Sequence, residues 1–337
     1  MSHVTYKAQR RRPGCLLTFL ILIAIGIGVL WFTSDDKANF PKNLFAVEPA
    51  MYGEDEFPSF EELWSYGSGS NKVVTIPISG MIMLGDEGSF MQQGSSASES
   101  LRGIRRATLD KDVMAIILNV DSGGGGITAS DIIYKALLDF KQADPNRKIV
   151  AIFNDTAASG AYYIALSADH IIAHPTTITG SIGVLIQSVN FQELALRHGI
   201  KSTTIKSGEN KDILNPLGTF TEEQKALMQS IVDALHTRFV MLVAKHRNKS
   251  ETDVRSFADG RIFTADEALK LGLIDEIGYW RDAMTRTAEL LDVDTIAVYR
   301  YNKDFSFSEL LRASKSINPQ SWFNLNQHPL LQYRWAP

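Results

Sequence analysis

The sequence contains one cysteine, Cys15, so no intramolecular disulfide can form and core packing must stabilise the fold. It also lacks a basic surplus, since the formal net charge is −4 and the only charges in the first 34 residues are basic. Nucleic-acid binding is therefore not expected, because phosphate recognition needs a basic surface. No cysteine or carboxylate cluster supports His170 and His174 as metal ligands, and we expect no metal and no cofactor.

One uncharged segment, Cys15–Thr33, is long enough to cross a membrane, because 19 helical residues at about 1.5 Å each just span a hydrocarbon core of roughly 30 Å. A basic cluster that includes Arg10–Arg12 precedes it, and Asp35 and Asp36 follow it. The N-terminus should therefore stay on the cytoplasmic side of the cytoplasmic membrane, and the chain after the membrane segment should lie on the periplasmic or extracellular side. A cleavable signal peptide is the alternative, because small residues at Ala24–Gly28 resemble a cleavage site.

Composition divides the remaining chain into a linker, a globular domain and a tail. Residues 1–14, before the membrane segment, should form a basic cytoplasmic tail. Residues 34–71, after it, mix charges, prolines and a Gly-Ser run, which is typical of a linker or stalk. Within the stalk, the stretch 60–64 favours a short helix. A globular domain is expected over 72–300. The polar tail at 301–337 carries scattered aromatics and is expected to pack on a neighbour or the membrane surface, or to be a partly ordered terminus.

Within the globular domain, apolar strands alternate with amphipathic helices, which is the signature of an α/β protein with a largely parallel sheet. Expected strands are 73–83, 113–120, 148–154 and 170–173, with extended segments at 179–186 and 202–205. Expected helices are 96–108, 129–141, one that starts at Ser159, 221–245, one that Thr264 caps and Gly272 ends, and one that starts at Tyr279.

Three separate motifs supply what a serine acyl-transfer enzyme needs, namely a nucleophile, a base and oxyanion donors. Ser159 lies in a small, apolar stretch (TAASGAYY), and the glycine run 123–126 lets backbone N–H groups approach a substrate. A lysine can remove the serine proton only when it is neutral, which requires its pKa to fall from about 10.4, and apolar surroundings have that effect. Spacing alone does not choose Lys211 over Lys201 and Lys206. A lone serine between alanine and glycine is usually a packing residue.

In combination and in this chain order, the motifs resemble the signal peptide peptidase A (SppA) family, membrane-bound serine peptidases with a Ser-Lys dyad on a Clp-protease/crotonase-like fold. The resemblance extends over about residues 72–290 and includes the order of residues 259–275. It implies stacked sheets flanked by helices, preceded by one transmembrane helix. It also implies Ser159 as the nucleophile and Lys211 as the base, since residues 211–216 match the family pattern Lys-x-x-hydrophobic-x-Pro.

The same resemblance implies the rest of the site. The N–H groups of Gly125 and Gly160 would form the oxyanion hole, and Ser181 would hydrogen-bond Lys211 and hold it toward the nucleophile. The family usually has a proline where this chain has Gly123, so we expect a looser loop there. The resemblance further implies a ring or dome of subunits, with catalytic groups shared across the interface.

The leading hypothesis is a membrane-anchored serine endopeptidase that degrades signal peptides or other membrane-associated peptides. Its partners would be these peptides, the membrane and other copies of the chain. A stomatin-specific type of membrane peptidase from the same clan is the nearest alternative. A crotonase-like acyl-CoA enzyme would need catalytic carboxylates and a cytosolic cofactor, and a non-catalytic membrane scaffold would tolerate the loss of Ser159. Five of the seven histidines are available to a Ser-His enzyme, and none of the five is in a family-like motif: His170, His174, His198, His236 and His246.

Carboxylates close to the base are a difficulty for lysine chemistry. Glu209 and Asp212 flank Lys211 in the sequence, and a carboxylate within about 4 to 6 Å favours the charged ammonium. Both carboxylates are therefore expected to point to solvent.

Overall fold

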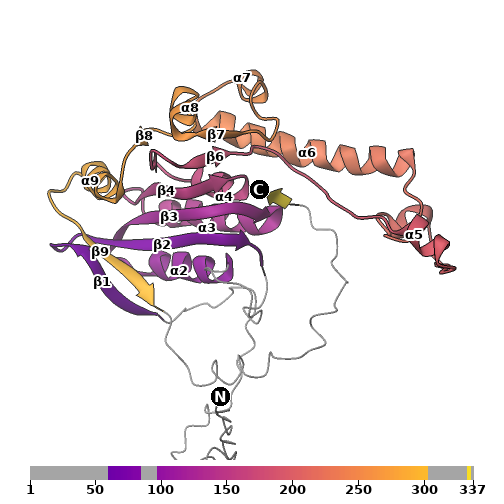
Figure 1. The fold of residues 1–337 in the computed structure, drawn as a ribbon. Coiled ribbons are helices and arrows are strands. Elements are labelled where there is room, and N and C mark those ends of the chain that lie inside the picture. The colour runs from indigo at the N-terminus through magenta and orange to yellow at the C-terminus, as the bar shows by residue number, and fades with distance from the viewer. Residues whose placement is uncertain (1–59, 85–96, 303–331, 335–337) are drawn as a thin grey trace, which may run out of the picture. The chain divides into compact units, whose positions relative to one another are not determined.

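The computed structural model describes residues 60–84, 97–302 and 332–334, so the predicted membrane segment 15–33 lies outside the described residues. Parallel strands form the centre of the sheet: β2 (Lys72–Ile82), β3 (Val113–Gly126), β4 (Lys148–Ala158) and β5 (His170–Ala173) (Figure 1). Three strands complete its edges: β8 (Glu276–Ile277) parallel to β5, β9 (Ala297–Asn302) parallel to β2, and β1 (Glu61–Gly67) antiparallel to β9. The expected α/β architecture is confirmed.

The sheet branches where β4 ends. Residues Thr156–Ala158 of β4 pair with β6 (Ile178–Gly180), and β7 (Ile262–Thr264) pairs antiparallel with β6. A short C-terminal strand, β10 (Gln332–Arg334), pairs with the end of β3. The described strands therefore form one branched, hydrogen-bonded sheet, where stacked sheets were expected.

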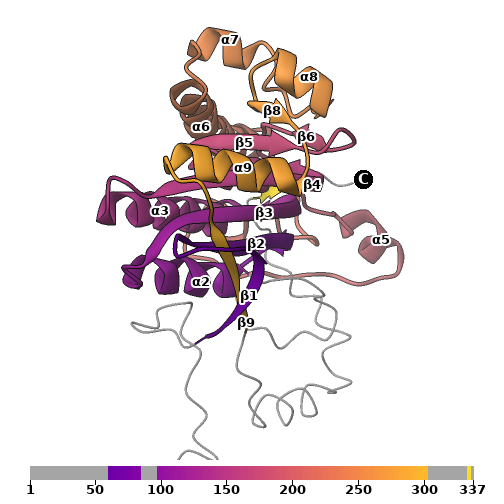
Figure 2. The ribbon, with the colours of Figure 1, turned by 90° about the vertical axis from the view of Figure 1, so that its left-hand side faces the viewer.

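Alternation along the central strands buries both faces of the sheet. Ile116 and Leu118 of β3 belong to the larger core, whereas Ala115 and Ile117 point to the other face and belong to a smaller core. The helices that contribute to the larger core include α2 (Ala97–Leu109), α3 (Ile127–Ala143), α4 (Gly160–Ala165) and α6 (Glu222–His246). Helix α9 (Trp280–Leu290) covers the smaller core and lies in front of the sheet in Figure 2.

Local capping signals predicted the helix starts correctly. Thr221 caps α6 through the backbone N–H of Gln224, and Thr264 caps α8 (Ala265–Lys270) in the same way with Glu267. The remaining helices are α5 (Gln192–Arg197), the 3₁₀ turn η1 (Glu209–Asp212) and α7 (Glu251–Arg255).

One local expectation was wrong. The stretch 60–64, expected as a short helix, lies largely in strand β1, whose residues pair with β9 more than 200 positions later. Pairing with such a distant partner satisfies the backbone of a segment whose own sequence is ambiguous, and it overrides local preference. Of the two expected extended segments, 179–186 contributes two residues to β6 and an isolated bridge at Leu185, and 202–205 forms no strand.

Within the described residues, α6 is the one helix long and apolar enough to cross a membrane. Its C-terminal half contributes Phe239, Val240 and Val243 to the core of the domain. We therefore assign α6 to the folded domain, and the membrane segment expected at 15–33 stays a prediction.

Burial of His246 makes the stability of the fold depend on pH. Its Nε2 lies 2.6 Å from the hydroxyl of Tyr134, and burial, aided by Lys245, lowers the pKa of His246 from 6.5 to about 4. The unfolded chain binds a proton at this residue near pH 6.5, but the folded chain does so only near pH 4. The free energy of unfolding should therefore fall by at most about 3 kcal/mol as the pH drops through this window.

Urea unfolding between pH 4 and 7 measures this effect, with His246→Gln as the control. Glutamine can still hydrogen-bond Tyr134 but does not titrate, so the variant should show a flatter pH dependence. Equal slopes for the two proteins would contradict the prediction.

Candidate active site

Ser159 occupies a sharp turn between a strand and a helix. Strand β4 ends at Ala158 and α4 begins at Gly160, and between them Ser159 has φ 58° and ψ −119°, a conformation that L-residues rarely adopt. Two backbone hydrogen bonds hold it there: its N–H donates to Gly180 O at 2.8 Å, and its carbonyl accepts from Tyr163 N at 2.9 Å. Its side chain is fully buried, and within the described residues Oγ has no hydrogen-bond partner. Ser159 is thus held in a strained turn with an unused hydroxyl.

Ser181 lies beside Ser159 because their strands run in parallel. Ala158 of β4 pairs with Gly180 of β6, so the residue that follows each strand emerges at the same edge. Ser181 also has a positive φ, 50°, and its N–H donates to Arg261 O at 2.8 Å. The structure therefore brings together two buried serines that stand 22 positions apart in the sequence.

The two glycines of the expected oxyanion hole flank this turn. Gly160 is the first residue of α4, where a backbone N–H has no acceptor within the helix. Gly125 lies near the end of β3, and a Cβ atom there would stand 2.1 Å from Ile82 O, so only glycine fits the close pairing with β2. Strands β3 and β4 pair as far as Ser122 and Ala157, which places this end of β3 next to the Ser159 turn.

The glycine run is a strand, where a loosened loop was expected. Gly123, which stands where the family usually has a proline, lies within β3, so the sheet continues through this position. Ser122 supports the strand from its side, because its Oγ donates to Gly80 O at 2.6 Å and accepts from Gly124 N at 3.0 Å. Pairing with β2 and this serine together keep the glycine backbone in place.

The C-terminal strand β10 pairs with the edge of the glycine run that β2 does not cover. It pairs antiparallel with Gly124–Gly126, while β2 pairs with Gly124 and Gly125 on their other side. On this side of β3, β4 is the partner as far as Ser122, and β10 is the partner beyond it. Strand β10 also contacts α4, as Figure 1 shows. The edge next to the Ser159 turn accepts an extended backbone. No local sequence signal announced this pairing in the tail.

Lys211 does not join Ser159 within the described part of the chain. It lies in η1, within a long excursion of residues 185–221, the arm, which leaves the sheet after β6, carries α5 and returns to α6 (Figure 1). No residue of the arm is buried, and Lys211 is exposed. In contrast, the rival Lys206 donates to Asp212 at 2.6 Å and to Glu209 O at 2.9 Å.

This engagement separates the two lysines. The ammonium of Lys206 lowers the pKa of the Asp212 carboxyl, and this carboxylate is committed to Lys206. For the side chain of Lys211, by contrast, no hydrogen bond or ion pair is found among the described residues, and only its backbone N–H donates, to Gly208 O at 3.1 Å. Asp212, expected to point to solvent, instead forms this ion pair on the arm.

Histidine does not complete the site either. His170 lies 3.1 Å from Glu276, His246 bonds Tyr134, and His174 packs edge-on against Tyr279. Among the described residues no histidine hydrogen-bonds Ser159, which removes support from the Ser-His alternative. The same described residues form no cluster of three or more histidine, cysteine or carboxylate side chains that could hold a metal ion.

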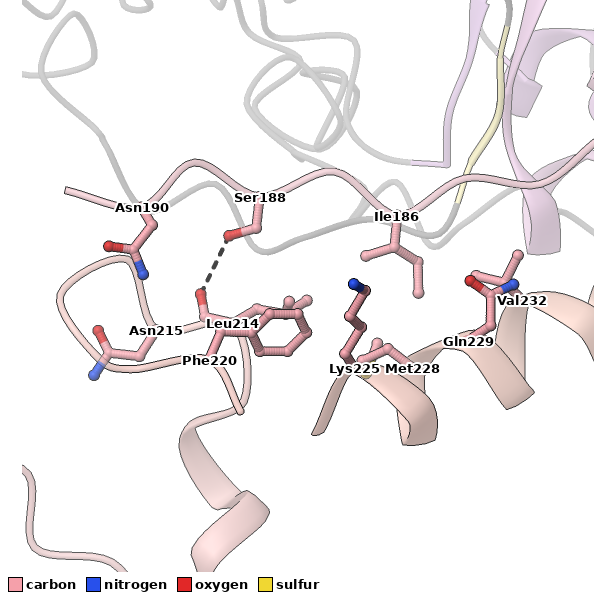
Figure 3. Close-up of a pocket in the computed structure, with 10 residues that line it drawn as sticks. All are labelled: Ile186, Ser188, Asn190, Leu214, Asn215, Phe220, Lys225, Met228, Gln229 and Val232. Carbon is pink, nitrogen blue, oxygen red and sulfur yellow. Dashed lines mark hydrogen bonds between the residues drawn. The ribbon is translucent and has the colours of Figure 1, made fainter. Parts of the chain in front are cut away.

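A pocket of about 270 Å³ lies elsewhere, between the arm and the start of α6 (Figure 3). Ile186 and Phe220 of the arm face Lys225 and Met228 of α6, and Ser188 Oγ donates to Leu214 O at 3.4 Å. None of the expected catalytic residues lines it. The pocket belongs to the base of the arm.

Residues 141–294, which include Ser159, Ser181 and Lys211, match the model of peptidase family S49. A putative signal peptide peptidase SppA of Enterococcus faecium is 33% identical over 286 residues, which cover 85% of this chain and 82% of that protein. The chain belongs to peptidase family S49. The S49 assignment makes the chain a serine peptidase. Gly125, one of the two expected oxyanion donors, lies outside the matched part of the chain.

Two solved structures are also similar. A membrane-bound stomatin-specific protease is 19% identical, with 65% of this chain and 86% of that chain covered and a TM-score of 0.42. ClpP1 from Listeria monocytogenes is 17% identical, with 62% and 93% covered and a TM-score of 0.38.

Proposed function

We propose that this S49 peptidase is a membrane-anchored serine endopeptidase that cleaves signal peptides or other membrane-associated peptides through an acyl-enzyme on Ser159. The observation that carries the proposal is the strained turn at Ser159, with a buried and unpartnered hydroxyl beside the glycine end of β3. Peptide hydrolysis by the full chain, measured beside Ser159→Ala, is the direct test. The orientation of the domain rests on the basic cluster Arg10–Arg12, and protease added to cells stripped of any outer barrier would test it.

The chemistry follows from the roles of five groups. Ser159 Oγ attacks the scissile carbonyl carbon as its proton passes to the neutral amine of Lys211, and the N–H groups of Gly125 and Gly160 stabilise the oxyanion. The C–N bond then breaks, and Lys211 returns the proton to the leaving amine. Water attacks the acyl-enzyme by the same route and regenerates Ser159. Ser181, beside the nucleophile, orients the amine of Lys211 toward it.

The base comes from a second copy of the chain. In its own chain Lys211 stands on the exposed arm, apart from the buried Ser159. The arm also exposes large apolar side chains, which is unfavourable in water for a monomer. Among them are Val189, Phe191, Leu194, Leu196, Ile200 and Ile205. Docking of the arm on a neighbour would bury these side chains and carry Lys211 into an apolar site. A closed ring of subunits would repeat this contact at every interface.

Peptide substrates bind as an extra strand on the free edge of the glycine run. Strand β10 supports this mode, because it is an extended segment paired antiparallel with Gly124–Gly126 next to α4. Main-chain hydrogen bonds of this kind hold a peptide of almost any sequence, and they place its carbonyl groups beside the oxyanion donors.

If substrate and β10 use the same edge, they compete. Replacing Tyr333 and Arg334 together by proline removes two neighbouring N–H groups, one of which must point toward β3 in an antiparallel pair. The variant should show a KM for a peptide substrate that is about threefold to tenfold lower, because a tethered segment competes at an effective concentration in the millimolar range. Its kcat should not change.

The double alanine variant at the same two positions is the matched control, since it keeps both N–H groups and should behave as wild type. Steady-state kinetics of the full chain in detergent measures all three proteins. An unchanged KM in the proline variant would show that β10 does not compete with substrate.

A further inference from the structure

A cluster of Asp131, Tyr163 and Arg238 joins three helices behind the Ser159 turn. The hydroxyl of Tyr163 on α4 donates to Asp131 Oδ1 on α3 at 2.6 Å and accepts from Arg238 Nε on α6 at 3.1 Å. Arg238 Nη2 also donates to Asp131 Oδ1 at 2.6 Å, which closes the triangle. The three helices are therefore tied at one point by directional bonds.

Two of the three residues lie close in sequence to a part of the site. Tyr163 stands one helical turn after Ser159, and its N–H donates to Ser159 O at 2.9 Å. Asp131 is the fifth residue of α3, which begins directly after the glycine run of β3. Helix α4 has only six residues, so its orientation depends on anchors of this kind. A shift of Tyr163 would move both the nucleophile and the N–H of Gly160.

These bonds contribute little to the stability of the fold, but they fix the orientation of α4. The side chains of Asp131 and Arg238 are 37% and 53% exposed, and an ion pair at such a site contributes little to the free energy of unfolding. Tyr163, however, is fully buried, and its pKa is raised by burial and by the nearby Asp131 carboxylate, so the hydroxyl stays protonated and donates to that carboxylate. Apolar packing alone lets a short helix slide or rotate, whereas a hydrogen bond fixes both distance and angle.

We propose that Tyr163 is a positioning residue of the peptidase. Its hydroxyl, held by Asp131 and Arg238, fixes α4 against α3 and thereby sets the Ser159 hydroxyl and the Gly160 N–H relative to the Gly125 N–H. This role rests on the proposed function, because it acts through Ser159 as nucleophile and these glycines as oxyanion donors.

Tyr163→Phe removes the hydroxyl and keeps the ring. We expect kcat for a peptide substrate to fall about tenfold, because small misplacements of reacting groups are costly, while KM changes less than about twofold. The rate at which a fluorophosphonate labels Ser159 should fall by the same factor as kcat. This second readout reports the nucleophile and its oxyanion donors without a peptide substrate.

Tyr134→Phe is the matched control. Tyr134 packs edge-on against Tyr163 with ring centroids 5.4 Å apart, and its hydroxyl bonds His246 at 2.6 Å instead of a residue of the cluster. The control loses a comparable hydroxyl bond from the same core, but α4 keeps its anchor. Its kcat and labelling rate should stay within about twofold of wild type. A loss as large as that of Tyr163→Phe would show that general stability, and not positioning, matters here.

Two further variants test the partner. Asp131→Asn keeps an oxygen that accepts from Tyr163 and should retain most activity, whereas Asp131→Leu should lose about as much as Tyr163→Phe. The double variant Asp131→Leu/Tyr163→Phe should lose no more than either single variant, because both changes break the same anchor. Additive losses, or an unchanged labelling rate in Tyr163→Phe, would overturn the proposal. A wild-type chain that is not labelled at Ser159 would instead reject the proposed function, and this role with it.

Discussion

Ser159→Ala should abolish peptide hydrolysis, with a loss in kcat/KM on the order of 10⁴-fold or more, because the acyl-enzyme cannot form. Its stability should not fall. The Ser159 hydroxyl is buried without a partner among the described residues, so its removal breaks no hydrogen bond and relieves an unsatisfied polar group. Hydrolysis assays together with urea unfolding of the same proteins measure both effects. Loss of function without loss of stability is the pattern expected of a nucleophile.

Ser167→Ala provides the contrast within the same region. Ser167 is also buried and follows α4, but its Oγ donates to Ile164 O at 2.8 Å. That variant should lose about 1 kcal/mol of stability and keep its activity. Wild-type hydrolysis by Ser159→Ala would eliminate the serine-peptidase mechanism at this residue.

Lys211→Ala should be as inactive as Ser159→Ala when each is assayed alone, because nucleophile and base act as one unit. Co-expression of the two variants should restore activity if the dyad forms between copies. Random assembly joins an intact Ser159 with an intact Lys211 at about one quarter of the interfaces, half times half, so about a quarter of wild-type activity is expected. If the dyad formed within one chain, no mixture of the two variants could be active.

Two substitutions on the same arm sharpen this experiment. Lys211→Arg should remain inactive in the mixture with Ser159→Ala, since a guanidinium stays protonated and cannot accept the serine proton. Lys201→Ala, which removes another exposed lysine of the arm, should be active by itself. An inactive mixture from well-assembled protein would contradict the exchange of Lys211 between copies. An active Lys211→Arg enzyme would mean that another residue is the base.

Features with a local signature were predictable from the sequence. The apolar runs of β3, β4 and β5 and the capping residues Thr221 and Thr264 located strands and helix starts to within a few residues. Features that depend on a distant partner were not. Strand β1 was expected as a helix and β10 as part of a tail, because each exists only through pairing with a strand far away in the sequence.

The sequence by itself determined the chemical groups, their order and the family of the chain, since residue type and motif spacing are local properties. Only the tertiary structure decided how these groups meet. Parallel pairing of β4 with β6 puts Ser181 beside Ser159, and the turn between β4 and α4 imposes the positive φ of Ser159. The exposed course of the arm keeps Lys211 away from the Ser159 of its own chain. These relations arise from strand register and packing between segments 20 to 50 residues apart, for which no short motif is a code.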